Sequence, residues 1–124
     1  MTNQGHASRE QYVNMTELLA RVDNDRELLA ELFALFQKDF PRLRDALHGA
    51  VDSGNPLQVE EAAHTLKGML ANLSIKQGAE LAAGVEAAAH TGDMLQIGQA
   101  VAAFHRETAG LPAALHSFRT GWEK

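Results

Sequence analysis

The chain has 124 residues, no cysteine and a formal net charge of −5, with 16 acidic and 11 basic side chains. This length fits one domain that buries a core without disulfides or a structural metal. The acidic balance and the lack of a basic stripe argue against nucleic-acid binding, which depends on clustered Lys and Arg. No apolar run reaches the about 18 residues of a membrane span or resembles a signal peptide, so we expect a soluble, cytoplasmic protein.

Residues 1–12 are predicted to be a flexible tail, followed by a short amphipathic helix with Met15, Leu18, Leu19 and Val22. In residues 24–51 apolar side chains recur every three or four positions, which predicts a long helix. They are Leu29, Leu32, Phe36, Phe40, Leu43, Leu47 and Ala50. Asn24, three residues before Glu27, resembles a capping box. Pro41 is expected to bend this helix.

A turn and a third helix are predicted next, because Gly54 can adopt positive φ, Asn55 can cap, and Pro56 suits the first helical position. This helix should end near Ser74. Its inward positions are Val59, Ala62, Ala63, Leu66, Leu70 and Leu73. A fourth helix, roughly residues 76–90, has a core face made mostly of alanine, and Gly92 can end it.

The most regular apolar pattern lies near the C-terminus, after Asp93 as a predicted cap. It comprises Met94, Ile97, Val101, Phe104, Thr108, Leu111, Leu115 and Phe118. Gly110 and Pro112 predict a break in this helix. No strand pattern is present, so we predict an all-α, antiparallel up-down-up-down four-helix bundle with a short additional N-terminal helix. It should span residues 13–120 as a monomer, with residues 121–124 as a tail.

His64 stands out in the third helix because its neighbours on the same face are polar or small. Glu60, Glu61, Lys67 and Gly68 lie three or four residues from it, while the apolar positions point elsewhere. An interior helical glycine costs about 1 kcal/mol relative to alanine, which suggests that Gly68 clears space for an approaching group. Lys67 offers a positive charge to an anion on the ring. These residues point to an exposed nucleophilic or phosphoryl-carrying histidine.

Two other interpretations of His64 stay open at this point. A lone histidine on a helix is usually a surface or boundary residue, and the chain has five others. Glu61 and His64 also form a Glu-x-x-His pair like those of di-iron bundles, which require a second such pair. Glu86 and His90 are one residue too far apart to supply it. We therefore predict no metal and no cofactor.

The stretch "AAHTLKGMLANLS", between "GNPLQVEE" and "GAELAAGVEAAAHTGD", resembles the histidine-containing phosphotransfer (HPt) domains of multistep phosphorelays. The resemblance extends over roughly residues 14–118. It implies that Nε2 of His64 accepts a phosphoryl group from the aspartyl phosphate of a receiver domain and passes it to another receiver. It also implies that Lys67 stabilises the phosphate and that Gly68 leaves room for the receiver's loops.

The same resemblance implies no ATP binding, in agreement with the lack of a Gly-rich nucleotide loop, and assigns magnesium to the receiver. The chain departs from the family pattern at Met69, Leu70 and Ser74, the last of which stands where a glycine is frequent. An adaptor that binds receivers without being phosphorylated is the alternative function. A dimerising histidine-kinase hairpin fits poorly, because this chain supplies four long helices itself.

Antiparallel pairing about turns near residues 53 and 74 places Leu43, Arg44, Gly84 and Val85 at the level of His64. Arg42 or Arg44 could add positive potential there, although an exposed arginine is by default a solvated charge. The expected partner-binding surface is the exposed strip around His64. It includes Leu57, Glu60, Glu61 and Ala71.

Overall fold

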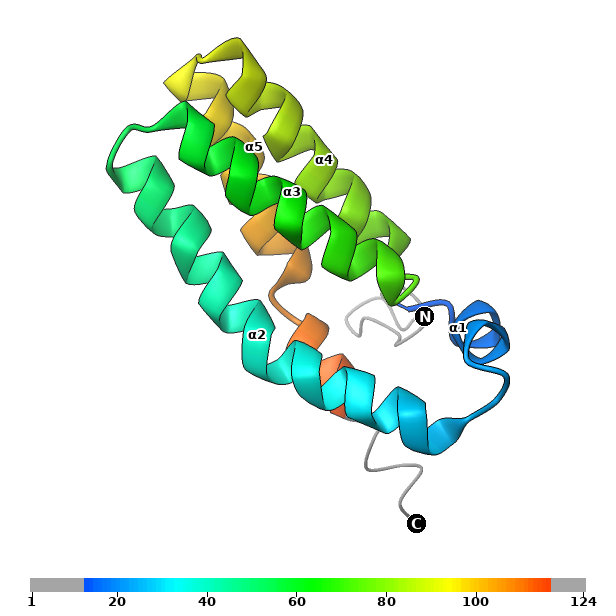
Figure 1. Ribbon diagram of the computed structural model, residues 1–124. Coiled ribbons are helices and arrows are strands. Elements are labelled where there is room, and N and C mark those ends of the chain that lie inside the picture. Colours follow the sequence, from blue (N-terminus) through cyan, green and yellow to red (C-terminus); the bar gives the residue numbers. More distant parts are fainter. Residues whose placement is uncertain (1–12, 117–124) are drawn as a thin grey trace, which may run out of the picture.

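The computed structural model describes residues 13–116 as an antiparallel bundle of helices, with no strand in that range. Its helices are α1 (Met15–Arg21), α2 (Arg26–Asp52), α3 (Pro56–Asn72), α4 (Lys76–Thr91) and α5 (Met94–Thr108) (Figure 1). Residues 111–116 are helical again. The predicted tails, residues 1–12 and 121–124, and Phe118 lie outside the described residues. The predicted all-α bundle with a short N-terminal helix is confirmed.

Asparagine and aspartate side chains begin most of the helices. The Asn55 side chain accepts a hydrogen bond from the backbone N–H of Gln58 at 3.2 Å, and Pro56 follows as the first helical residue, both as predicted. Asp93 caps α5, and Gly92 before it has a φ of 78° that only glycine adopts at little cost. The chain therefore turns sharply between consecutive helices.

The predicted cap of α2 is wrong by one residue. Asp25, and not Asn24, accepts the hydrogen bond from the backbone N–H of Leu28 at 3.0 Å. Asn24 has a φ of 60°, in the left-handed region that asparagine tolerates better than most residues. The backbone turn that joins α1 to α2 therefore uses Asn24, and the capping position moves to the next residue.

The helix α2 continues through Pro41 from Arg26 to Asp52 without a break. Its buried residues include Phe33, which the seven predicted inward positions omitted, while Leu32 and Leu43 are only partly buried. Phe36 and Phe40 stack at 4.6 Å between ring centroids. The core of the bundle is therefore rich in aromatic rings along α2.

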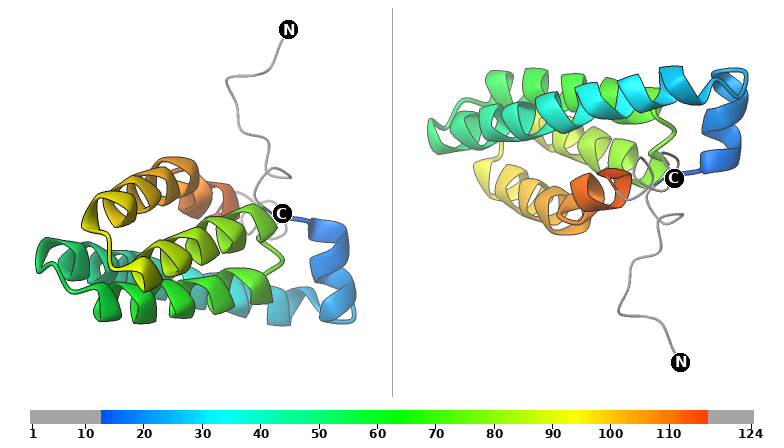
Figure 2. Two further views of the ribbon diagram at one scale, coloured as in Figure 1. Left: turned by 90° about the horizontal axis from the view of Figure 1, so that it is seen from above. Right: turned by 90° about the horizontal axis from the view of Figure 1, so that it is seen from below.

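Figure 2 shows α2 and α3 in one layer and α4 and α5 in a second. The helix α3 packs most closely on α4, where the buried side chains are small. A Cβ added to Gly78 of α4 would lie 3.3 Å from a terminal methyl of Leu70, so this glycine lets α3 approach closely. The short separation allows polar side chains on the outer edges of α3 and α4 to meet.

Most of the predicted apolar seam of α5 is buried: Ile97, Val101, Phe104, Thr108, Leu111 and Leu115. The predicted break is confirmed, since α5 ends at Thr108 and the chain turns at residues 109–110. The next segment is tied to α2 by a hydrogen bond of 2.7 Å from the Gln37 amide to the Pro112 carbonyl. No helix in residues 13–116 is long and apolar enough to cross a membrane.

The helix α3 ends at Asn72, two residues before the predicted end. Ser74 is buried and has a φ of 57°, the conformation that favours glycine. A hydrogen bond of 3.1 Å from Nη1 of Arg21 to the Ser74 hydroxyl helps to hold this turn, and the same nitrogen donates to the Ala71 carbonyl at 2.9 Å. The helix α1 thereby caps one end of the bundle.

Candidate functional site

The histidine singled out in the sequence lies on the outer edge of α3, where it faces solvent beside α4. Its side chain is 68% exposed, and that of Lys67, almost one helical turn later, is 37% exposed. The inward face of the same helix is occupied by Val59, Ala63, Leu66 and Leu70. The helical period thus leaves the His64 ring available to a partner, as predicted.

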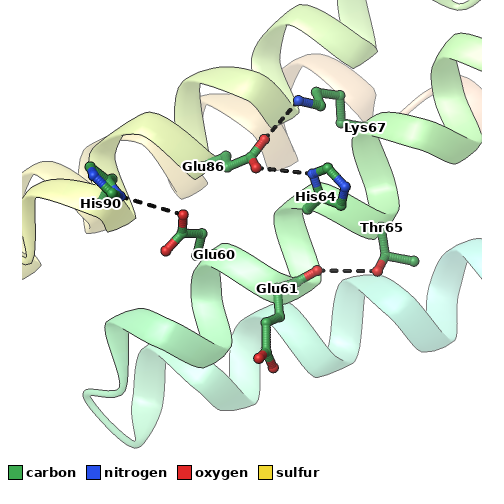
Figure 3. Close-up of polar contacts among 7 residues, drawn as sticks. All are labelled: Glu60, Glu61, His64, Thr65, Lys67, Glu86 and His90. Atoms are coloured by element: carbon green, nitrogen blue, oxygen red, sulfur yellow. Dashed lines mark hydrogen bonds and ion pairs between the residues drawn. The ribbon is translucent and has the colours of Figure 1, made fainter.

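Glu86 of α4 contacts both His64 and Lys67, as Figure 3 shows. One carboxylate oxygen lies 3.0 Å from Nδ1 of His64, and the other lies 2.9 Å from Nζ of Lys67. The Glu86 side chain is 23% exposed. A single carboxylate therefore fixes the relative positions of the two side chains that the sequence placed at the site.

The hydrogen bond from the Lys67 ammonium is the main reason that the pKa of Glu86 is lowered from its ordinary value, and the contact with His64 adds to it. Partial burial acts in the opposite direction. Glu86 is therefore ionised near neutral pH, and an ionised carboxylate can only accept hydrogen bonds. Nδ1 of His64 must donate, so in the neutral ring the lone pair lies on Nε2.

The predicted partner-binding residues fall into two groups. Leu57, which is 64% exposed, Glu60 and Glu61 line a hollow of about 430 Å³ together with His64, Thr65 and Glu86. In Figure 3 the Glu61 side chain points away from Glu86. Ala71 is exposed but lies about two turns of α3 beyond His64, near α1. The structure therefore brings three of these four residues to the histidine.

A second hollow, of about 380 Å³, lies between α3 and α4 next to the Glu86 contacts. Its lining comprises Glu60, Lys67, Ala83, Glu86, Ala87 and His90. Glu60 lies 3.5 Å from Nδ1 of His90, which forms a second bridge between the two helices (Figure 3). The small side chains of Ala83 and Ala87 add little bulk to this part of the surface.

Gly68 is exposed, and a Cβ built on it would have no atom of the neighbouring chain segments within 4 Å. Packing within the chain therefore does not require a glycine at this position. The α-helix also does not require it, since alanine is a better helix former by about 1 kcal/mol. The space above Gly68 is open to another molecule.

Comparison with known families supports the resemblance noted in the sequence. The sequence model of the Hpt domain family matches residues 27–119. The chain belongs to this family. Hpt domains act in phosphotransfer within two-component signalling, have no kinase activity of their own and interact with receiver domains. Comparisons with curated proteins and with solved structures found no match.

Sequence reasoning about this Hpt domain missed the contacts of Glu86. The expected register placed Gly84 and Val85 at the level of His64, one or two residues before the carboxylate that contacts it. A search for the nearest ionisable side chain to that level on α4 would have found Glu86, because long side chains reach over a helical turn. The only role weighed for Glu86 in the sequence was as a metal ligand.

The two arginines considered as sources of positive potential are placed elsewhere. Arg42 pairs with Asp39 on α2 at 3.2 Å, and the Arg44 guanidinium lies 4.9 Å from the centroid of the Phe40 ring. Lys67 is the cation that Glu86 holds beside His64. Within residues 13–116, no three His, Asp or Glu side chains are grouped in a way that could hold a metal ion.

Proposed function

We propose that this Hpt domain is a phosphorelay intermediate whose phosphoryl acceptor is His64. The observation that supports this best is the 3.0 Å contact between Nδ1 of His64 and Glu86, on a ring that is 68% exposed. The contact directs the lone pair of Nε2 away from the bundle, where a second protein can reach it. The phosphoryl donor is the aspartyl phosphate of a receiver domain, and the acceptor is the aspartate of another receiver.

The transfer step needs no proton to leave Nε2, because that nitrogen carries a lone pair. The lone pair attacks phosphorus, the N–P bond forms, and the P–O bond to the aspartyl group breaks with release of its carboxylate. The ring acquires positive charge during this attack while Nδ1 keeps its proton. The ionised Glu86 faces that N–H and stabilises the charge, as an acidic partner of histidine does in catalytic triads. The reverse step returns the phosphoryl group to a receiver carboxylate.

Lys67 and Gly68 have separate proposed roles in this step. The Lys67 ammonium sits one turn from the histidine, so it can neutralise part of the charge of a phosphoryl group bound to Nε2. Gly68 has no side chain, which leaves room for the receiver's loops to approach the ring. Neither role needs a cofactor on this chain, and magnesium belongs to the receiver.

The proposed docking surface is the exposed strip of α3 that runs from Leu57, Glu60 and Glu61 past His64 to Ala71. Just beyond it, α2 and α3 form an apolar groove of about 240 Å³. The groove is lined by Leu32, Leu35, Phe36, Asp39, Met69, Asn72 and Leu73. Leu35 is 55% exposed there, so a receiver seated over His64 can bury apolar surface in this groove at the same time.

The assignment can be tested by incubating the protein with a receiver domain phosphorylated with labelled phosphate. The wild-type protein should take up the label, and His64→Gln should not. His90→Gln is the matched control, because His90 is also exposed on this face and also lies close to a glutamate. This control should be labelled like the wild type.

Label retained by His64→Gln would contradict the assignment. Receiver binding that persists in His64→Ala, without any transfer in the wild type, would favour the adaptor function instead. Circular dichroism of each variant checks that the bundle is intact, which is expected because the His64 ring is mostly exposed.

A further inference from the structure

A pair of histidines on the other side of the bundle plays no part in the proposed phosphotransfer. His48 of α2 and His105 of α5 stack face to face, with ring centroids 4.3 Å apart and an angle of 11° between the planes. The helix α5 packs mainly on α4 and contacts α2 only over a short stretch. The stacked rings therefore belong to this short contact between α2 and α5.

The two histidines continue a row of aromatic rings from the core. The ring centroids of Phe40 of α2 and Phe104 of α5 lie 6.4 Å apart, and those of Phe104 and His105 lie 5.9 Å apart in an edge-to-face arrangement. Nε2 of His105 is buried and has no hydrogen-bond partner. Because this nitrogen lacks an acceptor, a proton placed on it would add an unsatisfied donor as well as a charge.

The charged groups around this pair also oppose protonation. Arg44 lies one turn before His48 on α2, and its guanidinium sits over the Phe40 ring. The pKa of His105 is lowered by burial first and then by His48 and Arg44. Four carboxylates lie at about the same level of the bundle as this pair: Asp45 and Asp52 of α2, Glu80 of α4 and Glu107 of α5. Within residues 13–116, none of them forms an ion pair with either ring.

Parallel stacking makes the pair unsuitable as a metal site. The lone pair of an imidazole lies in the plane of its ring, so two parallel rings direct their lone pairs along parallel lines and not toward one ion. The same arrangement is favourable for two neutral rings and unfavourable for two cations. Protonation therefore disfavours this arrangement of the rings, and the arrangement does not suit a metal ion.

We propose that the His48–His105 stack is an acid-sensitive latch that holds α5 against α2 while His105 is neutral and loosens when His105 takes up a proton. The unfolded chain takes up a proton at His105 near pH 6.5, whereas the folded chain resists it. Above about pH 7, His105 therefore leaves the free energy of unfolding unchanged. As the pH falls below about 6.5, His105 lowers the free energy of unfolding.

The latch can be tested by urea unfolding of the whole protein at pH 7.5 and pH 5.5. Between these values the unfolding equilibrium constant of the wild type should rise by a larger factor than that of His105→Phe, with about tenfold as the upper limit that an unfolded-state pKa near 6.5 sets. Phenylalanine can still stack on His48 and Phe104 but cannot take up a proton. His116→Gln is the control, because it also removes one histidine but lies outside the stack.

A second measurement keeps the test decisive if His105→Phe does not fold. Titration of the wild-type histidines by NMR should give a pKa for His105 below the ordinary histidine value, and His48→Gln should move it upward by removing a neighbouring cation. The protection factors of the α5 amides, which correct for slower intrinsic exchange in acid, should also fall at pH 5.5. A pKa of His105 at or above 6.5, or the same pH dependence in wild type and His105→Phe, would overturn the latch.

Discussion

The substitution Glu86→Gln tests whether the carboxylate between His64 and Lys67 assists phosphoryl transfer. Glutamine has the same shape, but its neutral oxygen faces the ring without a charge. It can also rotate to present its amide N–H₂ to Nδ1, which would move the ring proton to Nε2 and remove the attacking lone pair. The variant therefore changes the electrostatics and the tautomer while it preserves packing.

The expected magnitude follows from the two contacts at 3.0 Å and 2.9 Å. A hydrogen bond to a charged group contributes about 1.5–3 kcal/mol, and one between neutral groups contributes about 0.5–1.5 kcal/mol. The difference is about 1 kcal/mol, and exposure of the His64 ring keeps it near this lower end. This corresponds to roughly a fivefold slower acceptance of the phosphoryl group, and more if the amide reverses the tautomer.

The assay is a single-turnover measurement of phosphoryl transfer from an excess of phosphorylated receiver, followed over time by the label on this protein. Glu80→Gln is the matched control, because Glu80 is an exposed glutamate of the same helix that lies more than one turn before Glu86 and outside the proposed docking surface. Its transfer rate should stay within about twofold of the wild type. A Glu86→Gln variant that accepts the phosphoryl group at the wild-type rate would refute the proposed role of the carboxylate.

Two further substitutions test Lys67 and Gly68. Lys67→Ala should slow acceptance or hasten loss of the phosphoryl group by about two- to tenfold without unfolding the bundle, as measured by label retention. Lys76→Ala is the control: it breaks an exposed ion pair with Glu17 and should leave transfer unchanged. Gly68→Ala should stabilise the protein by about 0.5–1 kcal/mol in urea unfolding and still impair transfer, because the added methyl meets only a docking partner. Gly98→Ala in α5, which also meets no atom within 4 Å, should stabilise similarly and transfer normally; equal transfer by both variants would argue against a clearance role for Gly68.

The local features of this protein could be predicted from the sequence because a helix imposes a fixed period on its side chains. The spacing of Val59, Ala63, Leu66 and Leu70 placed those residues in the core and left His64 on the outer edge. Gly54, Asn55, Gly92 and Asp93 marked the turns, because each has backbone or capping chemistry that acts within a few residues. The end of α3 was misplaced where a tertiary contact from Arg21 helps to hold Ser74. The cap of α2 was misplaced by one residue because Asn24 takes part in the local turn that precedes the helix.

Only the packing of helices on one another decided which side chains meet across the bundle. A shift of one residue moves a helical side chain by about 100° around its axis, so an approximate register could not distinguish Glu86 from Gly84 or Val85 as the neighbour of His64. The stack of His48 on His105 joins residues 57 positions apart and left no periodic signal in the sequence. The sequence by itself therefore determined the helices and the exposed histidine. The tertiary structure decided which carboxylate orients this histidine and which two histidines stack between α2 and α5.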